Sequence, residues 1–301
     1  DIGALSYYMP RAGDFSDDGK VWRGGYGPRL FRWNEQPDVA WGGINQMQGV
    51  IDTFKKDRAT RQAVIQIWDP DQDGPEDESK DKPCTNYLHF MARDGKLDLM
   101  VVMRSNDLLW GFSSINVFEW TFLQELLANI LYFEVGKYYH VVDSLHIYLN
   151  HVGRLVDIIN TPQFDIYLDA RVKPTRIIHR DLELFCNDIK IFTSYIDRVN
   201  KGEKEGSRKF DLIVGGDPWL HSAYIALLIF KDIKENKIDI AIDRLPSMVA
   251  EDMFVVTMEY LSRHATIHND SDIAKRFHDL LKGWFKTQDS VAGEFILSGI
   301  T

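Results

Sequence analysis

The chain has 301 residues, of which 45% are hydrophobic and 27% are charged, and its formal net charge is −10. This length and composition suffice for one large globular domain or two small ones. The acidic balance argues against a protein that binds nucleic acid, although a local cationic pocket can still hold a small phosphate. A nucleotide is therefore a more natural partner than a polynucleotide.

The two cysteines, Cys84 and Cys186, are too few for a disulfide framework, and no metal-ligand spacing surrounds either of them. We therefore expect a reducing compartment and no metal site. No segment is apolar for long enough to span a bilayer, and no secretory signal is visible. The sequence thus predicts a cytoplasmic protein without a membrane partner.

Before residue 104 the pattern predicts mixed α/β structure. The expected elements are a helix over 44–54 and strands over 63–68, 87–91 and 97–103. The pair Asp94-Gly95 predicts a hairpin between the last two strands, because it favours a tight turn. The stretch 69–82 is acidic and rich in Pro and Gly, which is typical of an exposed loop.

Beyond residue 104 the expected structure becomes mainly helical. Asn116 opens an amphipathic helix, and the alternation over 143–148 predicts a strand with His146 and Tyr148 on one face. Further helices are expected over 182–199, 221–234, 240–245, 250–264 and 273–285, with a linker at 201–207. We expect a mixed α/β region over 1–174 and a mainly helical region over 175–301, which can belong to one domain or two.

Residues suited to covalent chemistry on a phosphorylated substrate cluster after residue 83. Cys84 offers a thiol, which needs a nearby cation to act as a thiolate nucleophile. The predicted hairpin brings Arg104 alongside Cys84, and Arg104 with Ser105 suits phosphate oxygens. A single cysteine is more often a small buried hydrophobe, and Cys186 keeps that interpretation.

Three more polar residues suit the rest of a nucleotide. The amide of Asn116 can read a base edge, although it also suits a helix N-cap. His146 and Tyr148 can together hold one sugar hydroxyl, although both also suit satisfied core positions. The order and spacing of these residues along the chain provide further evidence, in addition to their chemistry.

That order resembles the thymidylate synthase family, most closely its pyrimidine-nucleotide hydroxymethylase branch, over about residues 7–151. The matching motifs are Pro83-Cys84-Thr85-Asn86, Arg104-Ser105-Asn106-Asp107, Gly111, Asn116 and Asp143-Ser144-Leu145-His146-Ile147-Tyr148. The segment Tyr26-Gly27-Pro28-Arg29 resembles the family's Tyr-Gly motif, although composition alone predicts a surface turn there. The resemblance implies a bent mixed β-sheet with helices, and the helical region after it departs from the family's plan.

The resemblance implies one-carbon transfer from methylene-tetrahydrofolate to carbon 5 of a pyrimidine nucleoside monophosphate (dUMP, dCMP or CMP). Cys84 would add to carbon 6, and Asp107 would lie near the folate ring. The form Cys84-Thr85-Asn86 matches the hydroxymethylases, whereas most thymidylate synthases have Pro-Cys-His, so hydroxymethylation is favoured over thymidylate synthesis. A catalytically inactive nucleotide-binding or scaffold protein is the hypothesis from another class.

Asn116 takes the family's base-reading position only if the loop after Gly111 has one extra residue. Without that residue Ile115 would take the position, and isoleucine cannot hydrogen-bond a base. An asparagine there slightly favours uracil over cytosine as the substrate base, but a side-chain amide can flip and offer either its oxygen or its nitrogen. The substrate base therefore stays open at this point.

A last expectation concerns the substrate phosphate and a second subunit. In the family, two arginines reach the phosphate from the other subunit of a homodimer. Arg61 matches the first of them, Gln62 stands in place of the second, and Arg58 can compensate. The resemblance thus implies a homodimer with shared active sites, and the glutamate that the family uses for proton handling would precede Asp1.

Overall fold

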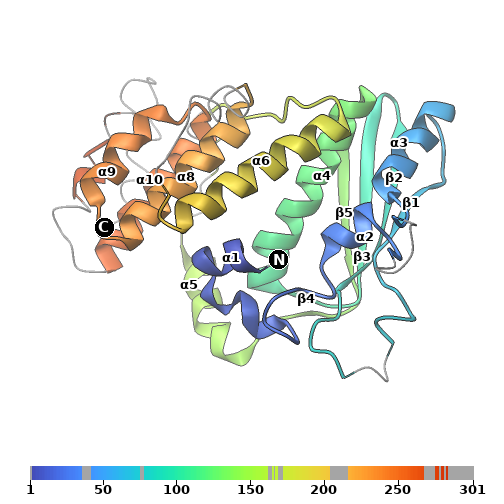
Figure 1. Cartoon of the computed structure of the whole chain (residues 1–301), viewed down its shortest axis with the longest axis horizontal. Helices are drawn as coiled ribbons and strands as arrows, with labels where there is room; N and C mark the ends of the chain where they lie inside the picture. Colours follow the sequence, from blue (N-terminus) through green and yellow to red (C-terminus); the bar gives the residue numbers. More distant parts are fainter. Residues whose placement is uncertain are drawn as a thin grey trace. The chain divides into compact units, whose positions relative to one another are not determined.

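The computed structural model (Figure 1) describes residues 2–35, 42–74, 78–161, 172–203 and 216–267, with short pieces at 165, 167–168, 275–277, 279–280 and 283. The chain forms two compact units. One comprises Asp1–Gly153 with Ile178–Asn187, and the other comprises Arg154–Ile177 with Asp188–Thr301. The expected functional division near residue 174 stays a prediction.

The first unit is built on a mixed sheet with the strand order β1-β2-β3-β5. The strands are β1 (Ala63–Gln66), β2 (Thr85–Arg93), β3 (Lys96–Met103) and β5 (Glu134–Val142). β2 and β3 form the expected antiparallel hairpin, and Asp94 and Gly95 turn it with φ angles of 51° and 76°. β-bulges between Thr85 and Tyr87 and between Leu97 and Leu99 bend the strands, so the bent mixed sheet is confirmed.

One face of this sheet is covered by the long helix α4 (Asn116–Leu131). β3 and β5 are parallel, so the chain must cross over between them, and α4 lies in that crossover (Figure 1). The inward residues of β3, from Leu97 to Met103, are fully buried. The buried Gln124 amide donates to the carbonyl oxygens of Leu97 (2.8 Å) and Lys137 (3.1 Å), which ties α4 to both strands. Helix α3 (Gln46–Lys56) buries its expected apolar side beside β1 and α4.

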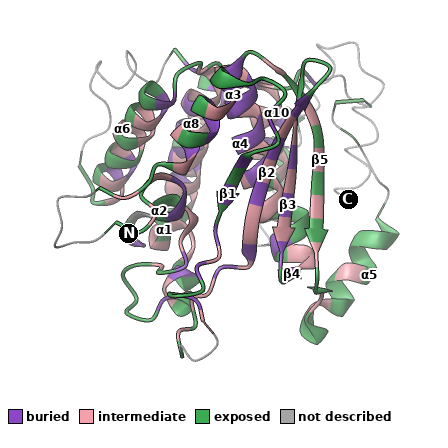
Figure 2. Cartoon of the chain, turned by 90° about the vertical axis from the view of Figure 1, so that its right-hand side faces the viewer, coloured by how far each residue is buried: buried purple, intermediate pink, exposed green. Residues whose placement is uncertain are grey.

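The opposite face of the sheet is more open in a single chain. Figure 2 shows buried and more exposed residues alternating along the strands, as expected when successive side chains point to opposite faces of a sheet. One cross-strand row runs through Val64, His89, Met100 and Tyr139. Val64 is 46% exposed and Tyr139 is 40% exposed. Large apolar side chains on this face are therefore left exposed by the described residues of the first unit.

The first unit also contains shorter elements, several of which follow the strand ends near the start of β2. They are α1 (Gly3–Tyr8), η1 (Pro10–Phe15), α2 (Tyr26–Phe31), β4 (Asn106–Asp107), η2 (Leu108–Ile115), β6 (Leu145–His146) and η3 (Leu149–His151). The strand expected over 143–148 is therefore reduced to two residues, because the long strand β5 ends just before it at Val142. β6 pairs in parallel with β4, apart from the main sheet.

The surface turn expected over 26–29 is wrong, and the loop over 69–82 is largely exposed as expected but contains one fully buried residue. The segment Tyr26-Gly27-Pro28-Arg29 is not a surface turn but the start of α2, and Arg29 is only 6% exposed. Its guanidinium forms an ion pair with Asp73, which is fully buried although it lies in the acidic stretch 69–82. A charge is buried only when it is paired, so the arginine and the loop aspartate are buried together.

In the second unit the described secondary-structure elements are all helices, joined by segments such as 172–177 that are not helical. Its helices are α5 (Val152–Asn160), most of α6 (Leu182–Asn200), α8 (Pro218–Lys234), α9 (Ile238–Arg244), η4 (Leu245–Ser247) and α10 (Glu251–Ile267). The mainly helical region is therefore confirmed. The helix expected over 273–285 and most of the linker at 201–207 lie outside the described residues. None of the helices that the structure describes is long and apolar enough to cross a membrane.

Candidate active site

Cys84 and Arg104 lie at the open end of the β2–β3 hairpin. Cys84 precedes the first residue of β2, and Arg104 follows the last residue of β3, so antiparallel pairing places them side by side. The Arg104 guanidinium Nε donates to the carbonyl oxygen of Pro83 at 3.0 Å, and Nη2 donates to that of Lys82 at 3.2 Å. Trp68 supports the guanidinium from 5.6 Å. The cation is thus held next to the thiol.

The thiol is shielded from water in this arrangement. Burial raises the pKa of the Cys84 thiol, and the positive charge of Arg104 only partly offsets this effect. Cys84 is therefore protonated at neutral pH, and a thiolate would have to form during reaction. Arg104 itself is exposed and keeps donors available for an anion.

Tyr26 is a site residue to which the sequence assigned no role. The buried hydroxyl of Thr85, the residue after Cys84, donates to the Tyr26 hydroxyl oxygen at 3.1 Å. The Tyr26 ring packs against Trp120 of α4 with 5.0 Å between centroids. Burial strongly raises the pKa of Tyr26, so its hydroxyl stays protonated and can donate. The Tyr26-Gly27 pair in the sequence was the available signal.

The loop between Gly111 and Asn116 contains a π-helix. Residues Leu108–Ile115 form η2, whose wider turns hold one more residue than those of an α-helix. This geometry accommodates the extra residue that the sequence comparison required. Ile115 is 42% exposed, whereas the side chain of Asn116 points to a partly buried carboxylate. The π-helix is thus compatible with the register that gives Asn116 the base-reading position, and that role stays a prediction.

Two asparagine side chains lie close to Gly111. An added Cβ at Gly111 would lie 1.7 Å from Asn106 Oδ1 and 2.6 Å from Asn116 Oδ1, so only glycine fits there. Asn116 is the first residue of α4 and does not cap it, so the interpretation of Asn116 as a helix N-cap is wrong. Its Nδ2 instead donates to Glu119 Oε1 at 2.7 Å, one turn further along α4.

Glu119 and two residues of β5 were missed by the sequence analysis. Burial raises the pKa of Glu119 to about 7, and the Asn116 hydrogen bond partly opposes the shift. The Tyr138 hydroxyl lies 2.6 Å from His140 Nδ1, and Asn106 Nδ2 lies 2.9 Å from His140 Nε2. The alternation along Glu134–Val142 and the three-residue spacing from Asn116 to Glu119 were the signals that point to them.

The two carboxylate oxygens of Asp107 differ in their hydrogen bonding. Oδ1 caps η2 by accepting from the backbone N–H groups of Leu109 and Trp110. Oδ2 is buried and receives no donor within the part of the chain that the structure describes. A buried acceptor of this kind is costly unless something donates to it. Asp107 therefore suits a ligand that carries N–H groups.

His146 and Tyr148 lie together, as the sequence predicts, beside the same segment. Parallel pairing sets His146 opposite Asp107, and the N–H of Asn106 donates to the carbonyl oxygen of Ser144 at 3.0 Å. The rings of His146 and Tyr148 meet edge to face, with 5.3 Å between centroids. Tyr148 is 58% exposed, so this pair is not a core contact.

The remaining predicted residues divide between the two ends of the sheet. Ser105 follows Arg104 and enters β4, so it lies at the Cys84 end. Arg61 precedes β1 at the other end, where Ala63 pairs with Phe90, a position about 20 Å along β2 from Cys84. Arg61 is therefore remote from the thiol of its own chain.

Arg58, the residue expected to compensate for Gln62, makes contacts within its own chain. Its guanidinium donates to the carbonyl oxygens of Leu131 (3.0 Å) and Tyr132 (3.3 Å) and lies 3.8 Å above the Phe133 ring. It thus binds the C-terminal end of α4, about 24 Å from Asn116 at the start of this helix. A role of Arg58 as a substitute phosphate arginine stays a prediction.

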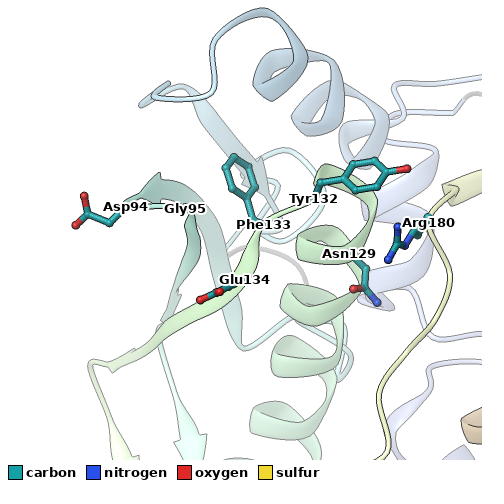
Figure 3. A pocket seen from close by; sticks show the side chains of 7 residues that line it. All are labelled: Asp94, Gly95, Asn129, Tyr132, Phe133, Glu134 and Arg180. Atoms are coloured by element: carbon teal, nitrogen blue, oxygen red, sulfur yellow. The ribbon is translucent and has the colours of Figure 1, made fainter.

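A cavity of about 380 Å³ lies at this remote end of the sheet and contains none of the predicted site residues. It is lined by Asp94, Gly95, Asn129, Tyr132, Phe133, Glu134 and Arg180. Figure 3 shows Arg180 beside Tyr132 and Asn129, with Asp94 directed away. The Arg180 guanidinium lies over the Tyr132 ring at 5.1 Å. The candidate active site is therefore the polar cluster around Cys84.

Comparisons with known proteins identify the family of the chain. Residues 14–192 match the family model described as "Thymidylate synthase". A deoxyuridylate hydroxymethyltransferase of Bacillus phage SP01 is 41% identical over 155 residues, which cover 51% of this chain and 40% of that protein. One from Delftia phage PhiW-14 is 33% identical over 206 residues, covering 65% of this chain and 55% of that protein.

A solved structure, the thermostable thymidylate synthase A from Bacillus subtilis, has a TM-score of 0.43 and 24% sequence identity, covering 50% of this chain and 52% of that one. The chain spans about half the length of the first two curated relatives, with 40% and 55% covered. The family match extends over more than half of this chain and includes the whole cluster around Cys84. The chain belongs to the thymidylate synthase family.

Proposed function

We propose that this protein transfers a one-carbon unit to carbon 5 of deoxyuridylate and releases 5-hydroxymethyl-deoxyuridylate. The observation that carries the proposal is the pairing of Cys84 with Arg104 at the open end of the hairpin. Two phage relatives named deoxyuridylate hydroxymethyltransferase support the choice of substrate and product.

The nucleotide phosphate and sugar would be held on either side of the thiol. Arg104 and Ser105 supply a guanidinium and a hydroxyl for the phosphate, which suits charge-assisted hydrogen bonds. His146 and Tyr148 supply polar tips for the sugar hydroxyl, and they lie beside this segment through the β4–β6 pairing. Asn116 then faces the edge of the pyrimidine.

Cys84 would act as the nucleophile. Its sulfur forms a bond to carbon 6, and the electron pair of the 5,6 double bond moves to carbon 5, stabilised by the oxygen on carbon 4. The Tyr26 hydroxyl, fixed by Thr85 next to the thiol, is placed to exchange a proton in this region. The buried setting raises the pKa of the thiol, so proton removal from Cys84 accompanies substrate binding.

The residues present fit a reduced folate. The buried Oδ2 of Asp107, which has no donor among the described residues, suits the N–H groups of a reduced pterin ring. Methylene-tetrahydrofolate would supply the one-carbon unit at the oxidation level of formaldehyde. Capture of the resulting exocyclic methylene on the nucleotide by water gives the hydroxymethyl product, whereas reduction gives thymidylate.

Product analysis tests the proposal. Purified protein is incubated with deoxyuridylate and methylene-tetrahydrofolate, and the nucleotides are separated by liquid chromatography and identified by mass. The proposal expects hydroxymethyl-deoxyuridylate without dihydrofolate. Thymidylate with an equal amount of dihydrofolate would establish the alternative, thymidylate synthesis.

A separate measurement tests the alternative hypothesis that the protein is an inactive nucleotide-binding or scaffold protein. Release of tritium from carbon 5 of labelled deoxyuridylate requires addition of Cys84 but no completed transfer. Release by the parent protein and none by Cys84→Ser would remove the inactive hypothesis. No release by either protein would favour it.

We also propose a homodimer with shared active sites. Arg61 lies about 20 Å along the sheet from the Cys84 end of its own chain, so a phosphate contact from Arg61 would have to reach another copy. The open sheet face, with Val64 and Tyr139 exposed, offers an apolar surface for that copy. We also propose a reducing, cytoplasmic location, because two cysteines are too few for a disulfide framework.

A further inference from the structure

Glu119 is the partner of the residue that faces the base. Asn116 Nδ2 donates to Glu119 Oε1 at 2.7 Å, within the range of a charge-assisted hydrogen bond. Among the described residues, no other donor reaches the Glu119 carboxylate, and no cation lies beside it. The carboxylate is partly buried, so this single contact is its main interaction in the site.

An ionised carboxylate can only accept hydrogen bonds, and this fixes the direction of the Asn116 amide. Nδ2 must point to Glu119, and Oδ1 must point the other way, towards Gly111. The absence of a side chain at Gly111 leaves room for Oδ1, because a Cβ there would approach it to 2.6 Å. The flip that a free amide could make is thereby prevented.

The fixed amide matches uracil and mismatches cytosine. Uracil presents a donor at N3 and an acceptor at the oxygen on carbon 4, which pair with Asn116 Oδ1 and with the second hydrogen of Nδ2. Cytosine presents an acceptor at N3 and a donor amino group on carbon 4. The acceptor Oδ1 would then face an acceptor, and the donor Nδ2 would face a donor. We propose that Glu119 is a positioning residue that holds the Asn116 amide in one orientation and thereby sets a preference for uracil over cytosine nucleotides. This inference rests on the proposed function in so far as Asn116 reads the base.

The proposal makes the preference depend on pH. Burial raises the pKa of Glu119 to about 7, so its carboxyl becomes neutral just below that value. A neutral carboxyl can donate its proton to Oδ1, which permits the amide to turn and present Nδ2 to N3 of cytosine.

The groups that face Glu119 do not change charge in this range. Tyr26 of α2 and Tyr138 of β5 both have pKa values raised, by burial first and also by the charge of Glu119, so both stay neutral. The pKa of His140 is lowered by burial, so its ring is neutral as well. The pKa of the Cys84 thiol, which adjoins Tyr26, is raised by burial. Glu119 is therefore the group near Asn116 that titrates near neutrality.

The test compares nucleotide binding without folate. The parent protein and Glu119→Gln are titrated calorimetrically with dUMP and with dCMP, about one pH unit above and below the Glu119 pKa. Glutamine is the same size but can accept or donate, so it permits both amide orientations. We expect the parent to prefer dUMP at the higher pH. Glu119→Gln should reduce the preference, measured as the dissociation constant for dCMP divided by that for dUMP, about tenfold. The parent's ratio should fall at the lower pH, whereas that of Glu119→Gln should not change.

Glu125→Gln, the same substitution further along α4, is the matched control and should keep the parent's ratio and its pH dependence. A purely structural role would weaken both nucleotides equally and leave the ratio unchanged, which would overturn the proposal. Retention of the parent's pH dependence by Glu119→Gln would overturn it too, as would binding of neither nucleotide by the parent. A changed ratio in a protein that forms no hydroxymethyl product would uphold the role of Glu119 while the proposed reaction fails.

Discussion

The backbone N–H of Arg104 donates to the carbonyl oxygen of Cys84 at 2.9 Å, so a hydrogen bond of the hairpin joins the thiol residue to its cation. The guanidinium folds back to the carbonyl oxygen of Pro83 on the other side of Cys84. Backbone pairing and side-chain contacts therefore hold the same charge beside the same sulfur. The consequences of this arrangement, and of others in the site, can be measured.

Arg104→Gln should make Cys84 less reactive. Burial raises the pKa of Cys84, and Arg104 opposes this, so removing the cation should raise the pKa further. Alkylation of Cys84 by iodoacetamide at neutral pH, followed by mass spectrometry of the Cys84 peptide, should slow several-fold. Arg93→Gln, at the far end of β2, serves as the control and should leave the rate unchanged. Equal rates in all three proteins would show that Arg104 does not act on the thiol.

Gly111→Ala should damage the site while leaving the fold intact. The added Cβ would overlap Asn106 Oδ1 and Asn116 Oδ1, so both amides must move. We expect dUMP binding to weaken at least about tenfold, the effect of one displaced hydrogen bond, with an unchanged circular dichroism spectrum. Gly49→Ala, in the exposed middle of α3 where a Cβ meets nothing, should instead raise stability by about 0.5–1 kcal/mol. Normal dUMP binding by Gly111→Ala would contradict the crowding seen here.

Asp73→Ala should destabilise the first unit strongly. Asp73 is fully buried and accepts from Arg29 Nη2 at 2.7 Å, so its removal leaves a buried guanidinium uncompensated. Breaking such a pair costs about 3–5 kcal/mol, which urea unfolding would detect. Asp14→Ala removes the partner of Arg11 in an exposed pair and should have no measurable effect. A small loss for Asp73→Ala would mean that water reaches Arg29 once the aspartate is gone.

Glu119 should make stability fall as the pH rises towards neutrality. Its pKa is about 7 in the folded chain against an ordinary value of 4.5, so the folded state binds more protons than the unfolded state between these values. The contribution of the protonated carboxyl to the free energy of unfolding is complete at low pH and is lost through this window. Urea unfolding of the parent and of Glu119→Gln over a pH series isolates the effect. The parent should lose stability relative to the variant as the pH rises, and parallel curves would show that the pKa is not raised.

Two inactive variants should restore activity to each other. In a shared-site dimer, Cys84→Ala and Arg61→Ala chains form heterodimers in which one site carries both lesions and the other carries neither. Each arginine contact to phosphate contributes about 1.5–3 kcal/mol, so each variant alone should be severely impaired. Mixing and re-equilibrating the chains should recover tritium release from labelled deoxyuridylate. Wild-type chains that exchange subunits while the mixed variants recover nothing would show that Arg61 serves no neighbouring site.

Local signals in the sequence were sufficient for the parts of the molecule that short-range physics controls. Asp94-Gly95 predicted the hairpin and therefore the meeting of Cys84 with Arg104, because a tight turn sets the register of both strands. The long helix after Asn116 followed from its apolar spacing in the same way. The family resemblance identified the thiol and the order of the surrounding motifs.

Tertiary structure decided the features that join distant segments. The burial of Arg29 with Asp73 depends on a contact across 44 residues, so composition alone placed both at the surface. The remoteness of Arg61 from Cys84 depends on the pairing of β1 with β2, which the sequence of either strand does not reveal. Glu119 acquired its raised pKa only because packing removed it from water, and its neighbours on the helix could not predict that burial. Desolvation is a property of the whole fold, so the spacing from Asn116 could indicate the contact with Glu119 but not the raised pKa of that carboxyl.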